Sequence, residues 1–265
     1  MRGQFASLTL MLFIFLPIKL AHANTFEITP TLFYFNYQEF DQNNVLLDKE
    51  EGVLAGVRLS YGDVTEKDSL NFNASFYGGT VDYTGQTQLG VPHETETNQQ
   101  LIKLGISYIQ HEETYYPGLF FAGLHYWYWD RDILTRNGVQ GLHELYTWYE
   151  TEIGLKFKSQ EIRQSSYWLK LSVMYNFKPE MKLFLPSSEV DFVLGSKPGY
   201  RIRAGKTWTN KQSMTTTIGL FAEYWEFGRS NTVFITDFFG SSDFLTEPDS
   251  QSFHSGIEFS FLFNF

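Results

Sequence analysis

The last nine residues of the chain, from Ile257 to Phe265, alternate between large apolar and mostly polar side chains. Every odd position is apolar, and the odd positions include the phenylalanines Phe259, Phe261, Phe263 and Phe265. A period of two residues is the pattern of a β-strand that has different surroundings on its two faces. Soluble proteins rarely expose an apolar stripe of this kind. The segment therefore predicts a strand whose outer face contacts lipid.

The alternating phenylalanines that finish at Phe265 resemble the C-terminal assembly signal of bacterial outer-membrane β-barrel proteins. The resemblance implies that the barrel-assembly machinery recognises this strand. It also implies that outer-membrane lipid and lipopolysaccharide surround the folded protein.

The same alternation recurs in eight segments upstream. Apolar residues occupy every second position near 53–61, 70–76, 102–108, 120–128, 149–157, 167–175, 202–204 and 218–224. A segment near 25–40 carries apolar residues at both parities, so its facing stays open. These segments and the last strand make ten, and an even number of antiparallel strands closes into a barrel without free edges. We therefore predict an all-β fold, a transmembrane antiparallel up-and-down β-barrel of about ten strands.

Composition excludes several other classes of protein. After residue 23 there is no apolar run near the roughly 18 residues that a membrane helix needs. The chain has no cysteine, so it contains neither a disulfide nor a cysteine-ligated metal site. Its 20 Lys and Arg residues against 30 Asp and Glu residues argue against nucleic-acid binding, which needs a basic face. We expect no cofactor, because no phosphate-binding loop or metal motif is present, and we predict no metal site.

Residues 1–23 have the pattern of a secretory signal peptide. Arg2 supplies positive charge, an apolar stretch runs from Leu8 to Leu20, and Ala21-His22-Ala23 is an A-x-A cleavage site. We therefore expect export, cleavage and a single outer-membrane barrel domain over residues 24–265.

The predicted connectors alternate in length. Those near 62–68, 111–117, 159–165 and 209–213 are short, whereas those near 41–51, 85–97, 130–145, 178–196 and 229–250 are mostly longer. Outer-membrane barrels have short periplasmic turns and longer outer loops. The pattern places the N-terminus in the periplasm and five longer loops at the cell surface.

The inward parity carries charges of both signs. The predicted lumen set is Arg58, Lys103, Glu150, Glu152, Lys156, Lys170, Arg201, Arg203, Glu223 and Glu258. In a narrow barrel such groups can pair across the interior and fill it, or they can line a small water-filled path. The sequence leaves both arrangements open.

Catalytic candidates lie near the outer rim. Asp130 and Asp132 stand two residues apart at a strand end, and His143 follows in the same predicted loop. Ten-stranded barrels resemble the omptin surface proteases in strand count, and those enzymes activate water with an Asp pair facing an Asp-His pair. The matching Asp-x-His sequence is absent here. His254 and His125 are further bases in principle, although the parity of His125 points it inward.

We predict an integral outer-membrane protein that presents exposed loops and has no enzymatic activity. A narrow porin or substrate-specific channel is the first alternative. An outer-membrane hydrolase, either an omptin-like protease or a lipid-modifying enzyme, is the second.

Overall fold

The computed structural model describes residues 23–64, 68–86, 90–110, 118–162, 164–186, 188–209, 214–236 and 242–265. The predicted signal peptide, apart from its last residue, lies outside the described residues, as does the predicted connector at 111–117. Within the described ranges there is no helix long and apolar enough to cross a membrane.

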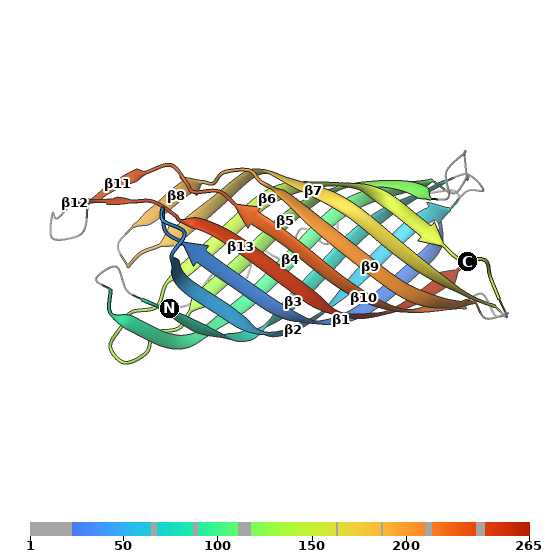
Figure 1. The fold of residues 1–265 in the computed structure, drawn as a ribbon, viewed down its shortest axis with the longest axis horizontal. Helices are drawn as coiled ribbons and strands as arrows, with labels where there is room; N and C mark the ends of the chain where they lie inside the picture. Colours follow the sequence, from blue (N-terminus) through green and yellow to red (C-terminus); the bar gives the residue numbers. More distant parts are fainter. Residues whose placement is uncertain are drawn as a thin grey trace.

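Ten antiparallel strands close into a tilted barrel (Figure 1). Each of them pairs with the barrel strands before and after it in the chain, and the first pairs with the last. The barrel strands are β1 (Ala23–Phe40), β2 (Leu46–Val64), β3 (Asp68–Gln86), β4 (Pro92–Gln110), β5 (Leu119–Ile133), β6 (His143–Lys158), β7 (Ser165–Phe184), β9 (Pro198–Thr209), β10 (Met214–Phe227) and β13 (Asp249–Asn264). The predicted fold class is confirmed.

Three short strands gather at one end of the barrel. β8 (Glu189–Val193) pairs with the last residues of β7, while β11 (Val233–Thr236) and β12 (Ser242–Leu245) form a separate hairpin. Figure 1 shows this end opposite the C-terminus. We call it the outer end, and we call the end with the C-terminus the inner end.

The predicted outer connectors are shorter in the structure than in the sequence interpretation. β2 already begins at Leu46, β4 at Pro92 and β6 at His143, and β7 continues to Phe184. On β4 the extension alternates between exposed polar and buried polar residues, such as Thr95 and Thr97 on the inner face, and on β7 a bulge at Lys178 interrupts the alternation. A hydrophobicity pattern does not detect such extensions, so the prediction of long loops over these segments was wrong.

An apolar belt surrounds the inner part of the barrel. Every barrel strand exposes at least one large apolar side chain on its outer face, and these include Leu32, Leu59, Phe72, Leu104, Leu124, Ile153, Leu171, Ile202, Leu220 and Phe259. On β2 the belt runs from Val53 to Tyr61, so the residues of this strand before Val53 lie beyond it at the outer end. The belt contains the outward residues that the sequence pattern predicts.

The first strand has a clear facing in the structure. Phe33, Phe35 and Tyr37 are buried inside the barrel, whereas Leu32 and Tyr34 are exposed outside. Both faces of this strand are apolar, for different reasons. The outward side chains belong to the belt, and the inward side chains pack on an aromatic ring of the opposite wall.

Aromatic side chains fill the barrel interior between the belt and the outer end. We call this group the aromatic plug, and it consists of Phe35, Tyr37, Trp127, Trp129, Tyr146, Trp148, Trp225 and Phe227. The ring centroids of Trp127 on β5 and Trp225 on β10 lie 5.9 Å apart, although three strands separate β5 from β10 around the wall. Those of Phe35 and Trp129 lie 6.0 Å apart, again across the lumen. Trp148 is fully buried in this plug.

Candidate functional site

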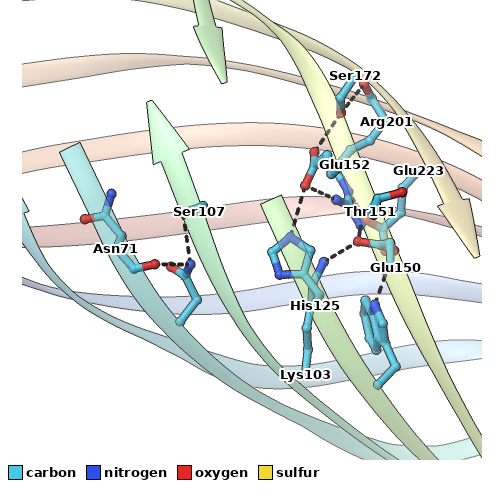
Figure 2. A network of polar contacts seen from close by, with 12 residues as sticks. Asn71, Lys103, Ser107, His125, Glu150, Thr151, Glu152, Ser172, Arg201 and Glu223 are labelled. Atoms are coloured by element: carbon cyan, nitrogen blue, oxygen red, sulfur yellow. Dashed lines mark hydrogen bonds and ion pairs between the residues drawn. The ribbon is translucent and has the colours of Figure 1, made fainter. Parts of the chain in front are cut away.

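The middle of the lumen contains a network of ion pairs centred on Arg201 of β9. Its guanidinium lies 2.6 Å from Glu223, 2.8 Å from Glu152 and 3.6 Å from Glu150. Figure 2 shows Arg201 among these carboxylates, which come from β6 and β10. All three Glu side chains have charged partners, and Arg201 is 4% exposed. Desolvated charges are tolerated inside proteins when they are paired in this way.

Further side chains complete this middle network. The Lys103 ammonium lies 2.8 Å from Glu150, and the indole N–H of Trp127 donates to the other carboxylate oxygen of Glu150 at 3.2 Å. His125 lies 3.5 Å from Glu152 (Figure 2). Gly105 and Gly123 leave room for this imidazole, because a Cβ at Gly105 would stand 2.1 Å from its Nδ1. The network therefore links opposite walls of the barrel.

His254 belongs to the same network. Its Nδ1 lies 3.2 Å from Glu223, and its ring packs edge-on against Trp225 with centroids 4.4 Å apart. The side chain is 2% exposed. A base acting on a substrate at the outer rim needs access to the surface, and His254 does not have it.

The outer end of the lumen holds a second charged group, which we call the outer cluster. Arg131 is at its centre and is 1% exposed; the carboxylates around it are Glu39, Asp48, Glu50 and Glu144. The Arg131 guanidinium lies 2.6 to 2.9 Å from Glu39, Glu50 and Glu144 and 3.8 Å from Asp48. It also lies 4.7 Å from the ring centroid of Tyr37 in the plug. One cation thus joins β1, β2, β5 and β6 across the lumen.

Neutral side chains donate hydrogen bonds to several carboxylates at this end of the lumen. Thr97 and Gln99 donate to Glu50 at 2.9 and 2.6 Å, and Tyr37 donates to Glu39 at 2.8 Å. The Tyr146 hydroxyl lies 2.9 Å from Glu247. Hydrogen bonds of this kind hold buried carboxylates in a fixed geometry, although Asp48 Oδ1 is buried without a partner.

Carboxylates outnumber cations in the outer cluster, and their protonation reflects this. Burial, and next the charge of Glu39, raises the pKa of both Asp48 and Glu247 well above the usual range. Burial also raises the pKa of Glu50 and Glu144, although the charge of Arg131 opposes it. The outer cluster therefore holds protons more tightly than exposed carboxylates do.

The carboxylates of Glu39, Glu144 and Glu247 come close enough together to hold a metal ion. The Arg131 guanidinium, however, already lies 2.9 Å from Glu39 and 2.6 Å from Glu144. A guanidinium in this position supplies the positive charge that a cation would bring. The prediction that the chain binds no metal stays a prediction.

The inner part of the lumen contains a polar cavity of about 250 Å³. Its lining reaches from Arg201 of the middle network to Thr25 and Leu262, near the inner ends of β1 and β13. Arg58 lies 3.3 Å from Glu27 and 3.4 Å from Glu258, and Arg203 lies 3.8 Å from the same Glu258 oxygen. We call this space the inner cavity.

All ten side chains of the predicted lumen set lie inside the barrel, in the middle network or along the inner cavity. The sequence interpretation missed the outer cluster. Arg131 stands between the two candidate aspartates, at the parity that carries Trp127 and Trp129 inward. This inward parity could have indicated that Arg131 faces the lumen, but residues 130–145 were predicted to be a loop.

The three catalytic candidates lie on the outside of the barrel. His143 Nε2 is 3.2 Å from Asp130, and their side chains are 42% and 26% exposed. Together with Asp132, Thr80 and Asn98 they line an open surface hollow of about 590 Å³ beyond the belt. The structure brings Asp130 and His143 together because β5 and β6 pair antiparallel, with Asp132 directly opposite His143.

Comparisons with known proteins identify the fold. No protein-family model matches this chain, and no curated protein sequence matches it. The outer membrane protease OmpT from Escherichia coli has a similar structure, with a TM-score of 0.52 at 9% sequence identity over 92% of this chain and 97% of that one.

Two further structures are more distant. The translocator domain of the autotransporter NalP from Neisseria meningitidis has a TM-score of 0.42 at 8% identity, covering 88% of this chain and 87% of that one. The P. putida toluene transporter TodX has a TM-score of 0.37 at 10% identity, covering 92% and 90%. The likeness at such identities concerns the fold and not the activity. The chain therefore has the closed antiparallel barrel fold of outer-membrane proteins, the class that its C-terminal strand resembles.

Proposed function

We propose that this chain is an integral protein of the bacterial outer membrane. The apolar belt on all ten barrel strands supports this location, because lipid accepts a closed barrel whose outer face is apolar. The fold likeness to OmpT supports it as well. In this orientation the inner end faces the periplasm and the outer end faces the cell exterior.

Within that membrane, we propose a non-enzymatic surface protein with a closed interior. The aromatic plug carries this proposal. Its rings meet across the lumen at centroid distances of 5.1 to 6.0 Å, which is the packing distance of a protein core. Rings packed above an ion-pair network occupy the lumen, which favours a closed barrel over a porin.

The outer end is the part of the molecule that this function uses. β2, β3, β4 and β7 extend beyond the belt, and β8 and the β11–β12 hairpin lie at the same end of the barrel (Figure 1). The outer cluster and the plug fix these extensions to one another from inside. A rigid support of this kind holds outer turns in place for contact with lipopolysaccharide, a host surface or another envelope component.

Thiol labelling of intact cells tests the location and orientation. Because the chain has no cysteine, single replacements report one position each. We expect a bulky maleimide that does not cross the outer membrane to label Ser188→Cys, in the exposed turn between β7 and β8. It should label Gln160→Cys, in the turn between β6 and β7, only after the membrane is opened. Labelling of Gln160→Cys on intact cells would contradict the orientation.

The contact between Asp130 and His143 favours hydrolysis at the membrane surface as a second candidate function. A His oriented by a carboxylate is a suitable general base for activating water. The test is turnover of peptide and lipid substrates by the folded protein, compared with Asp130→Asn and His143→Gln. Turnover lost in both variants would support a hydrolase, and turnover unaffected by both changes would remove this site.

A further inference from the structure

Three cations stand side by side on neighbouring strands in the inner cavity. Lys156 of β6 is directly opposite Lys170 of β7, and Lys170 is directly opposite Arg203 of β9. All three side chains line the inner cavity. Like charges placed directly opposite each other destabilise a sheet. This row therefore costs the barrel stability unless something negative lies beside it.

The described carboxylates supply negative charge to Arg203 but form no ion pair with the two lysines of the row. Glu258 lies 3.4 Å from Arg58 and 3.8 Å from Arg203, and Glu152 lies 2.8 Å from Arg201. Among the ion pairs of the described residues, none includes Lys156 or Lys170. The Lys170 ammonium instead lies 4.3 Å from the ring centroid of Phe121.

Charge in the cavity lining is unbalanced as a whole. The described residues of the lining include six Lys or Arg side chains and three Glu side chains. Glu150 and Glu223, which are not part of the lining, pair with Lys103 and Arg201, so the unmatched charge is that of the lysine pair. Hydrogen-bonding capacity is also left over, since Nε of Arg203 is buried without a partner. An anion in the cavity would satisfy both the excess charge and the free donors.

We propose that the inner cavity is a binding site for a small oxyanion of the phosphate type, held by Lys156, Lys170 and Arg203. A guanidinium and two ammonium groups offer several donors to the oxygens of such an anion. A volume of about 250 Å³ is below the usual size of a pocket for a drug-sized molecule, so the ligand is small. The lining reaches the inner end, and in the proposed orientation the anion enters from the periplasm.

Calorimetry with inorganic phosphate as the probe tests this site. The folded barrel in detergent micelles, titrated at low ionic strength, should bind one phosphate per chain. Lys170→Met should weaken the affinity at least about tenfold, because one charge-assisted hydrogen bond is lost. Lys156→Gln should weaken it in the same direction. Lys182→Gln is the matched control, because Lys182 is on the same strand beyond the belt, and it should bind like the parent protein.

Thermal unfolding separates a ligand site from a purely structural role. Phosphate should raise the Tm of the parent barrel and of Lys182→Gln but not that of Lys170→Met. Without phosphate, Lys170→Met should unfold at the same or a higher temperature than the parent, because repulsion within the row is relieved. Absence of phosphate binding to the parent, or equal affinity in all variants, would overturn the proposal.

Discussion

Single residues decide whether the lumen is held together, and Arg131 is the clearest case. Three carboxylates lie within 2.9 Å of its guanidinium, and they come from β1, β2 and β6. The sequence places Arg131 at an inward parity, yet its partners Glu50 and Glu39 are 81 and 92 residues away. Which side chains meet across a lumen depends on barrel closure and strand stagger. Local alternation therefore does not reveal this cluster.

Replacing Arg131 with Met should strongly destabilise the barrel. The change leaves buried carboxylates without their cation, and breaking a buried ion pair in this way costs about 3–5 kcal/mol. Urea unfolding in lipid vesicles measures the loss. Lys182→Met serves as the control, because its partners Glu189 and Asp191 are exposed, and it should unfold like the parent. An Arg131→Met barrel as stable as the parent would show that the cluster does not hold the outer end together.

The outer cluster should also make stability depend on pH. The pKa of Asp48 is raised in the folded protein, so its folded state binds the proton more tightly than the unfolded chain does. The stability that this proton contributes is present below the ordinary carboxyl range and is lost as pH rises through the folded pKa. The free energy of unfolding of Asp48→Asn should therefore rise relative to that of the parent as pH increases from the ordinary carboxyl range to the raised pKa of Asp48, by on the order of 1 kcal/mol per pH unit.

Unfolding midpoints at several pH values measure this difference. Asp191→Asn, at a position whose side chain is 78% exposed, should follow the parent curve. Parallel curves for Asp48→Asn and the parent would mean that Asp48 does not carry the excess proton.

At the scale of single strands, hydrophobic alternation predicts the outward face correctly where the two faces differ in polarity. On β13 the outward phenylalanines oppose the buried Glu258 and Ser260, so the pattern is unambiguous. On β1 the interior is itself aromatic, and Phe33 and Phe35 therefore conceal the facing. The bulge on β7 is a further limit, since Lys178 has a φ of 49° and the inward parity changes from even to odd residues around it.

Phe265 should affect assembly of the barrel into the membrane and not the stability of the folded barrel. Its side chain is 81% exposed, so truncation removes little packing. Phe265→Ala should leave urea unfolding unchanged but lower the amount of folded barrel in the outer membrane of cells, provided that the assembly machinery reads this end. Ile162→Ala, at an exposed turn position, is the control for both readouts. Equal membrane levels of parent and Phe265→Ala would remove Phe265 from the assembly signal.

For the whole molecule, the sequence predicts the barrel but not what fills it. Strand number, outward faces and inward charges follow from the period-2 pattern, because that pattern reports which face meets lipid. The plug follows from closure, which brings Trp127 of β5 against Trp225 of β10. The outer cluster, the aromatic plug and the middle network then fill the interior from the outer end down to the inner cavity.

Ion conductance across a planar lipid bilayer tests this closed interior most directly. We predict that the folded protein is silent, and that Trp129→Ala combined with Tyr146→Ala produces stable current steps by opening the plug. Trp208→Ala, which removes an exposed ring outside the barrel, should stay silent, and a heat-dependent gel shift confirms that each variant is folded. Stable, ion-selective steps from the parent protein would contradict the closed barrel and identify a narrow channel instead.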